Sequence, residues 1–314
     1  MIRIGIDEAG YGPLLGPLVV AGAVFRVADD GTDLRERLRG VVCRARGKRP
    51  TEALPVAIDD SKEVHGRYGV EGLARGVAAM VVGSGRASPT DLVDWLERFG
   101  DRPPAAFAAD PWFHEPARER VAAWDAPPGF CERLKLRGVE PRGITVSPAT
   151  AAELNEAFEA TGNKARVLFL ATAALLVRLL AEHPGEDVTA VLDREGGRLD
   201  YGPLLAGVFP FQGLEEERAP PGEAWYRLRE GGRTVRLRFV TKGDRVDLAT
   251  GLASMAAKLT RELFMGRLNA WFADRRPGLR PTAGYVDDGR RFLADVADVL
   301  EKERVDHRRF VRQR

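Results

Sequence analysis

Four acidic side chains each follow a short apolar run of the kind that forms a buried strand. The first two are adjacent, so their charges repel each other and are costly to desolvate. A divalent cation would offset both costs, and oxygen ligands are the ones that Mg²⁺ and Mn²⁺ prefer. Two ions about 4 Å apart could activate a water and stabilise a leaving oxygen in phosphoryl transfer. The candidate ligands are Asp7, Glu8, Asp193 and Asp244.

Each of these acids, taken singly, has an ordinary reading as a strand-end or turn residue. The adjacent pair Asp7 and Glu8 is harder to explain in this way, because dense apolar sequence flanks it on both sides. Strand ends at one edge of an α/β sheet are where binding sites gather. We therefore expect the four carboxylates to converge on a metal site.

Apolar periodicity predicts the elements that must position these acids. Strands are expected at residues 2–7, 18–27, 142–146 and 188–192, with a hairpin formed by 224–229 and 233–241. Helices are expected at residues 68–81, 90–99, 149–182 with a break near 161–163, 247–273 and 287–303. Residues 101–130 indicate a long irregular segment. This order of elements predicts an α/β fold, a mixed sheet flanked by helices.

Length and composition describe a globular chain. The 314 residues are 44% hydrophobic and 30% charged, and the net charge of +2 neither requires nor excludes a nucleic-acid partner. Two cysteines, Cys43 and Cys131, indicate no disulfide framework and fit a reducing compartment. No apolar segment has the length of a membrane span, and no secretory signal is evident. We expect a cytoplasmic protein with no membrane partner and no obligate protein partner.

Several short motifs extend the acidic pattern in a fixed order. They are Gly5–Pro13, Asp60-Ser61-Lys62, Val191–Asp193, Lys242-Gly243-Asp244, Ser254–Glu262 and Gly284-Tyr285. In this order they resemble ribonuclease HII, of the type 2 ribonuclease H family, and residues 242–262 fit the family pattern without a gap. The resemblance is poor near 95–145 and 200–235, which indicates a divergent member with insertions at these places.

The resemblance implies a ribonuclease H-like catalytic core over residues 1–246 and a helical C-terminal region, 247–314, packed on it. It implies an endonuclease that hydrolyses the RNA strand of RNA/DNA hybrids, or cuts at ribonucleotides embedded in duplex DNA. The products would carry 5′-phosphate and 3′-hydroxyl ends, and the activity would serve DNA repair and replication. By position, Asp7, Glu8, Asp193 and Asp244 would be the catalytic, metal-binding residues, with two Mg²⁺ or Mn²⁺ ions in the reacting complex.

The same resemblance implies a set of substrate-binding residues. A glycine turn would meet the ribose 2′-hydroxyl through its backbone, since that hydroxyl distinguishes RNA from DNA. The other residues of this set would contact phosphates, lie on one exposed helix face, or stack on a sugar. The set is Gly10, Tyr11, Gly12, Ser61, Lys62, Ser254, Lys258, Arg261 and Tyr285.

Three positions depart from the family pattern. Tyr11 replaces an arginine that grips phosphate, so a charge-assisted contact is lost. Val286-Asp287-Asp288 replaces the usual Pro-Thr after the tyrosine, and Glu262 stands where the family usually has Asp. Two alternatives therefore stay open: a ribonuclease HIII-like enzyme that prefers longer hybrids, and a divergent duplex-binding protein without catalysis.

Two basic features could add contacts to a nucleic-acid backbone. Arginines alternate along the predicted hairpin at positions 227, 229, 236 and 238, so that one face is expected to be basic. The C-terminal segment 304–314 is also basic. The plain alternatives are a solvated hairpin face and a frayed terminus.

Overall fold

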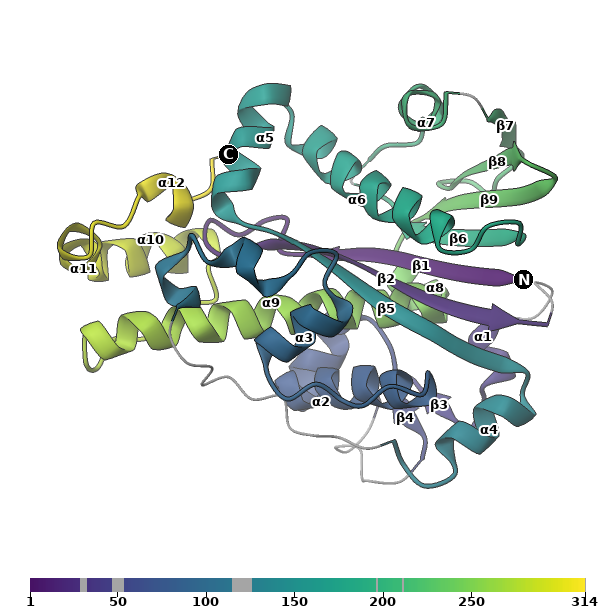
Figure 1. Ribbon diagram of the computed structural model, residues 1–314, viewed down its shortest axis with the longest axis horizontal. Helices are drawn as coiled ribbons and strands as arrows, with labels where there is room; N and C mark the ends of the chain where they lie inside the picture. The colour runs from purple at the N-terminus through teal and green to yellow at the C-terminus, as the bar shows by residue number, and fades with distance from the viewer. Residues whose placement is uncertain (29–32, 47–53, 115–125, 196, 211, 314) are drawn as a thin grey trace.

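A mixed sheet forms the centre of this computed structural model, which describes residues 1–28, 33–46, 54–114, 126–195, 197–210 and 212–313. Within these residues the sheet has seven strands in the order β5-β2-β1-β6-β9-β8-β7 (Figure 1). The strands are β1 (Ile2–Ala9), β2 (Leu18–Val27), β5 (Val139–Ala149), β6 (Val188–Asp193), β7 (Gly213–Glu217), β8 (Ala224–Glu230) and β9 (Arg233–Val240). β1 is antiparallel to β2 and parallel to β6, and β6 is parallel to β9. The predicted mixed sheet flanked by helices is confirmed.

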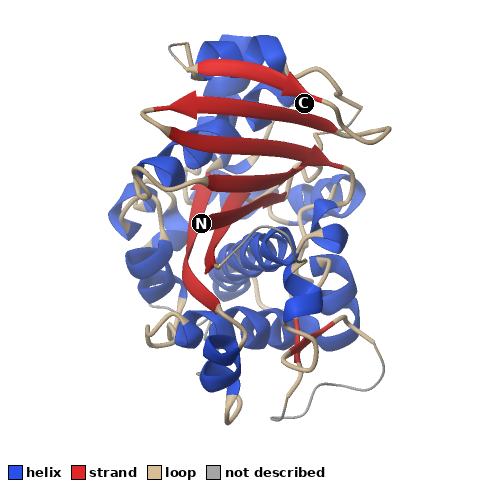
Figure 2. Ribbon diagram, turned by 90° about the vertical axis from the view of Figure 1, so that its right-hand side faces the viewer, coloured by secondary structure: helices blue, strands red, loops and turns tan. Residues whose placement is uncertain are grey.

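Helices cover both faces of the sheet, as Figure 2 shows in blue on either side of the red strands. One face carries α5 (Ala151–Thr161) and α6 (Lys164–Ala181), and the other carries α2 (Ser61–Gly83) and α9 (Leu248–Arg275). Smaller elements are α1 (Leu34–Arg37), α3 (Leu92–Phe99), α4 (Phe130–Leu136), α7 (Gly202–Val208), α8 (Gly243–Val246) and a two-stranded sheet of β3 (Val42–Cys43) and β4 (Val56–Ala57). None of the described helices is long and apolar enough to cross a membrane.

Alternation along β1 divides the core into two apolar clusters. Ile2, Ile4 and Ile6 pack on the α6 side, whereas Gly5 faces α9. An added Cβ at Gly5 would lie 2.0 Å from the backbone nitrogen of Thr250, so only glycine allows the helix to approach this closely. The strand that carries the acidic pair is therefore packed between α6 on one face and α9 on the other.

The N-terminal end of α9 is pinned to the sheet by polar contacts. Arg3 of β1 forms a buried ion pair with Asp247, 2.8 Å between the nearest atoms, and Asp247 also caps the helix through the backbone N–H of Thr250. The Thr250 hydroxyl donates to the carbonyl of Val191 in β6 at 3.1 Å. α9 shares one hydrophobic cluster with β1 and β2. The domain boundary expected at 246/247 stays a prediction.

Most of the expected elements form, with changes at their ends. The break near 161–163 is present: Gly162 ends α5 with a φ of 61°, and Asn163 caps α6. The strand expected at 142–146 is longer, because β5 pairs with β2 along its whole length. The helix expected at 287–303 is two helices, α10 (Val286–Asp295) and α11 (Ala297–Lys302).

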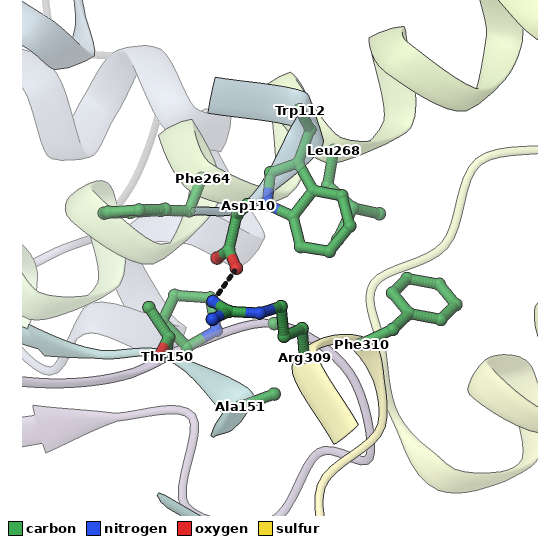
Figure 3. Close-up of a pocket in the computed structure, with 10 residues that line it drawn as sticks. Asp110, Trp112, Thr150, Ala151, Phe264, Leu268, Arg309 and Phe310 are labelled. Carbon is green, nitrogen blue, oxygen red and sulfur yellow. Dashed lines mark ion pairs between the residues drawn. The ribbon is translucent and has the colours of Figure 1, made fainter. Parts of the chain in front are cut away.

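The described part of the irregular segment after α3 packs against the C-terminal chain. It contains two short 3-10 turns, η1 (Pro104–Phe107) and η2 (Pro111–Phe113), and residues 115–125 lie outside the described part. The Trp112 ring packs against Phe310, with ring centres 5.8 Å apart, and Asp110 faces the Arg309 guanidinium at 3.8 Å (Figure 3). This segment therefore joins α9 to the C-terminal chain.

The C-terminal chain is docked rather than frayed. It includes α12 (His307–Phe310), the Phe310 side chain is buried, and Val311 bridges to Leu15 in the turn after β1. Figure 1 shows α10, α11 and α12 gathered beyond the end of β1 that lies away from the N-terminus. The segment thus lies beside the turn that the sequence marks as a binding element.

The predicted basic hairpin forms, but its charge is partly balanced. Arg227 lies directly opposite Arg236, as expected for one face of β8 and β9. Glu215 of the neighbouring strand β7 pairs with Arg227 at 2.6 Å, and it also lies 3.7 Å from Arg229. These contacts favour a solvated, ion-paired face over a phosphate track.

Candidate active site

The acidic residues gather at one edge of the sheet because β1, β6 and β9 run parallel. The β1–β6 register ends at Ile6 opposite Leu192, which leaves Asp7 and Asp193 as the next neighbours on the two strands. Asp193 pairs in turn with Val240, the last residue of β9. Carboxyl ends of parallel strands meet at the same edge. The local strand pattern thus places two of the predicted acids side by side.

Asp244 reaches this edge through a tight turn after β9. Lys242 adopts a left-handed conformation, φ 55°, and Gly243 donates its backbone N–H to the Asp193 carboxylate at 2.7 Å. A Cβ at Gly243 would lie 3.1 Å from side-chain atoms of Thr250 and Val240, so the turn has little room for a larger residue. Asp244 is the second residue of α8.

The four carboxylates share one electrostatic field. Burial, followed by the charges of Glu8 and Asp193, raises the pKa of Asp7 well above its usual range. Burial and then Asp193 raise the pKa of Glu8 to about 7, and burial also raises the pKa of Asp193. Burial, followed by the charges of Asp60 and Asp193, raises the pKa of Asp244 to about 6. Negative charge at this edge is therefore costly unless a cation offsets it.

The alternation of β1 places the adjacent pair on opposite faces. Asp7 is buried on the α9 side near Ser254, whereas Glu8 lines a cavity with Leu168 of α6. Among the described residues, no three His, Cys, Asp or Glu side chains are arranged so that they could jointly hold a metal ion. The predicted convergence on one metal site stays a prediction.

The donor set itself fits a hard divalent cation. All four predicted ligands offer carboxylate oxygen, and Mg²⁺ and Mn²⁺ are bound through such oxygens. Burial is the largest cause of the raised pKa of each carboxyl group, and the nearby charges of Lys62 and Arg245 oppose this rise at three of the four groups without cancelling it. Asp7, Glu8, Asp193 and Asp244 are thus the residues that would hold such ions.

The Asp60-Ser61-Lys62 motif lies beside the acids at the start of α2. Asp60 caps the helix by accepting the backbone N–H of Lys62 at 2.8 Å. Ser61 is buried, and its hydroxyl accepts a hydrogen bond from Ser254 of α9 at 3.0 Å. Lys62 is exposed, and its charge opposes the burial that raises the pKa of both Glu8 and Asp193. The structure thus brings Lys62 within electrostatic reach of the cluster.

Two buried arginines support the glycine turn. Gly10 has a φ of 91°, and a Cβ there would lie 2.5 Å from the carbonyl oxygen of Pro17 and 2.8 Å from the Arg261 side chain. Arg312, from the C-terminal chain, donates to the carbonyl of Gly10 at 2.6 Å and to that of Tyr11 at 3.4 Å. A Cβ on Gly12 would meet no atom within 4 Å, so the outer side of the turn is open.

The remaining predicted substrate contacts differ in accessibility. Tyr285 is 51% exposed, with its ring 5.8 Å from the Arg261 guanidinium carbon. Arg261 itself is only 1% exposed and donates to the carbonyl of Ala283. Lys258 pairs with Glu262 at 2.6 Å, one helical turn away. Ser254 and Arg261 are both buried, so the helix face predicted to be exposed is not exposed at these two positions. Contact of the remaining residues with a substrate stays a prediction.

Sequence reasoning missed Glu195. It follows β6, its carboxyl group is buried, and burial and then Glu8 raise its pKa to about 8. Thr172 lies close enough to favour the charged form, yet neither carboxylate oxygen has a hydrogen-bonding partner of good geometry in the described structure. The signal available in the sequence was an acid two residues after Asp193, which is too common to stand out.

Sequence reasoning also did not single out Arg312. The basic composition of the C-terminal segment was noted, but composition does not reveal which arginine turns inward. Docking of this segment against Leu14, whose carbonyl accepts the Arg312 backbone N–H at 3.0 Å, carries the side chain to the glycine turn.

No protein-family model matches the chain, and no curated protein sequence does. Similar solved structures include RNase HII from Archaeoglobus fulgidus, in a complex with PCNA, at 17% identity and a TM-score of 0.45, covering 100% of this chain and 95% of that one. Ribonuclease H2 from Pyrococcus horikoshii OT3 has 14% identity and a TM-score of 0.45, covering 99% and 92%. Bst-RNase HIII in complex with Mn²⁺ has 14% identity and a TM-score of 0.42, covering 99% and 66%.

Proposed function

We propose that this protein is a metal-dependent endoribonuclease of the ribonuclease HII type. It would hydrolyse the RNA strand of RNA/DNA hybrids, or cut at ribonucleotides embedded in duplex DNA, and leave 5′-phosphate and 3′-hydroxyl ends. The observation that carries the proposal is the register of β1 and β6, which sets Asp7 beside Asp193 at one sheet edge. The order of motifs along the chain supports the same reading.

The residues of this chain have separable parts in the proposed reaction. The four carboxylates would hold the ions, which supply an activated water and offset charge on the leaving oxygen when bound. Lys62 is exposed beside Glu8 and Asp193, where it would attract a phosphate toward the acids. The exposed Tyr285 ring offers a surface for a sugar to stack on.

The glycine turn would supply recognition of the ribonucleotide. Arg312 donates hydrogen bonds to the carbonyl oxygens of Gly10 and Tyr11, so these two oxygens point toward Arg312. The open space beside Gly12 would let a nucleic-acid backbone come close. The 2′-hydroxyl is the group that separates RNA from DNA at such a site. An enzyme of this kind would act in DNA repair and replication.

The decisive experiment compares three labelled duplexes: all-DNA, DNA with one ribonucleotide, and an RNA/DNA hybrid. Each is incubated with Mg²⁺, Mn²⁺ or EDTA, and the products are analysed on denaturing gels with end-group assays. We expect cleavage only where ribonucleotides and a divalent ion are both present. Asp7→Asn should abolish cleavage while the protein stays folded, and Glu97→Gln, an exposed change on α3, should cleave like wild type.

The other outcomes identify the alternatives. Cleavage confined to the long hybrid would favour the ribonuclease HIII type. Tight binding of duplexes without any cleavage in either metal would overturn the proposal and favour a duplex-binding protein.

A further inference from the structure

The short helix that carries Asp244 ends in backbone carbonyls that have no donor within the helix. α8 spans only Gly243–Val246, and the chain becomes extended at the next residue. The last carbonyl groups of a helix need donors from elsewhere, and arginine side chains can supply them. Arg35 of α1 donates to the carbonyl of Asp244 at 2.9 Å. Arg44, which follows β3, donates to the carbonyl of Arg245 at 2.8 Å. Two arginines from distant segments therefore cap α8.

One buried carboxylate holds both arginines in place. Asp59 is 6% exposed, and one of its oxygens accepts a hydrogen bond from Arg44 at 3.1 Å and lies 3.8 Å from the Arg35 guanidinium. The other oxygen accepts the backbone N–H of Ala45 at 3.1 Å. Arg35 also donates to the carbonyl of Ile58 at 2.6 Å. Both guanidinium groups are therefore fixed to the segment before α2 while they reach α8.

A glycine in α9 makes room for the contact between Arg35 and Asp244. A Cβ at Gly251 would lie 2.8 Å from the carbonyl oxygen of Asp244 and 2.9 Å from the Arg35 guanidinium. Glycine is less favourable than alanine within a helix. The close approach of these two groups gives a physical reason for a glycine at a position where alanine would favour the helix.

We propose that Arg35 is a positioning residue for Asp244. It fixes the backbone that carries this carboxylate, and Gly251 leaves the space in which it does so. On the other side of the same turn, Gly243 donates its N–H to the Asp193 carboxylate. A backbone that is ordered in advance loses less freedom when a ligand binds, so the affinity is higher. This inference rests on the proposed function and adds to it a residue outside the acidic motifs.

The first measurement is Mn²⁺ binding by isothermal titration calorimetry without nucleic acid, at a temperature where circular dichroism shows every variant folded. Arg35→Ala should weaken Mn²⁺ binding about tenfold, as is typical when a residue that orients a metal ligand is removed. The sign is informative, because loss of a nearby positive charge would by itself tighten the binding of a cation. Gly251→Ala should weaken binding to a similar extent, since its methyl group displaces the same contact.

Two matched controls accompany these variants. Arg39→Ala removes an exposed arginine that lies just after α1. Gly66→Ala adds a methyl group to an exposed glycine of α2, where a Cβ would meet no atom within 4 Å. Both controls should bind Mn²⁺ like wild type.

The double variant Arg35→Ala/Gly251→Ala separates a shared contact from a general loosening of the fold. If both substitutions act on the Asp244 carbonyl, the double variant should bind Mn²⁺ no more weakly than the weaker single variant. Independent effects would instead multiply to a loss of about a hundredfold.

Hydrogen exchange measured by mass spectrometry in EDTA follows the turn without metal or cleavage. The backbone N–H of Asp247 donates to the carbonyl of Gly243 at 2.8 Å. Arg35→Ala and Gly251→Ala should each speed exchange in the peptide that contains Asp247, because the turn opens more often. Exchange in the peptide that covers β8 should stay unchanged.

Unchanged Mn²⁺ affinity in Arg35→Ala, multiplied losses in the double variant, or unchanged exchange at the turn would each overturn the positioning role. If wild type cleaves and binds Mn²⁺ while any of these results is found, the proposed function stands without this residue. If wild type neither binds Mn²⁺ nor cleaves, the proposed function fails, and the exchange result alone decides whether Arg35 holds the turn.

Discussion

Replacing Glu8 by glutamine should stabilise the protein in a way that depends on pH. Burial and then Asp193 raise the pKa of Glu8 from 4.5 to about 7. Below pH 4.5 the group is protonated in both the folded and the unfolded chain, so the carboxylate imposes no penalty. As pH rises through 7, the folded protein must ionise a group that it holds unfavourably, and stability is lost. Glu8→Gln removes this loss while keeping the side-chain shape.

The size of the effect follows from the same pKa. A change from 4.5 to about 7 corresponds to about 3 kcal/mol at pH well above 7. Glu8 is only partly buried, so solvent screening reduces this to about 1–2 kcal/mol. For a chain of this length we expect a melting temperature about 2–4 °C above wild type at pH 8, and no difference at pH 4.5.

The assay is thermal unfolding in EDTA at a series of pH values, followed by circular dichroism. Glu97→Gln is the control, because Glu97 is an exposed acid on α3 and its replacement should give a constant difference across the series. If the melting temperature of Glu8→Gln differs from that of wild type by the same amount at pH 4.5 and pH 8, the claim that the acids at the sheet edge interact electrostatically is refuted.

Three further outcomes are expected. Mg²⁺ or Mn²⁺ at about 100 times its dissociation constant should stabilise wild type by about 2.7 kcal/mol in thermal unfolding, and this gain should shrink sharply in Asp7→Asn. Arg312→Gln should cost about 2 kcal/mol of unfolding free energy in urea titrations and raise KM, because two partly buried carbonyls lose a charged donor. Arg308→Gln, at an exposed position of the same segment, should do neither. Replacing Arg227 and Arg229 together by glutamine should leave the salt slope of duplex binding unchanged, because Glu215 already faces both; a lower slope would restore the basic hairpin as a nucleic-acid contact.

Much of the architecture could be predicted because it depends on local periodicity. The hairpin of β1 and β2, the break between α5 and α6, and the acids at the ends of β6 and β9 all follow from patterns within about ten residues. The length of β5 could not be predicted in this way. Its pairing with β2 joins segments more than 100 residues apart, and that partner decides where the strand begins and ends.

The same distinction between local pattern and long-range contact applies to the side chains. Alternation in β1 was readable in the sequence, yet only packing shows that Asp7 lies against α9 and Glu8 against α6, because the identity of each layer depends on the whole topology. The basic hairpin was a correct pattern whose charge is balanced by β7, a strand the periodicity did not predict.

The sequence by itself determined which residues can do chemistry: the acidic pair, the acids after two later strands, and the glycines of the first turn. Residue type and strand periodicity are local properties, so they need no partner to be recognised. Only the tertiary structure decided which polar groups find hydrogen-bonding or charged partners. Arg312 meets the turn at Gly10 from the far end of the chain, and Glu195 is buried where the charge of Arg198 reaches its carboxylate. Pairing and burial are properties of contacts between distant segments, and no pattern within one segment contains them.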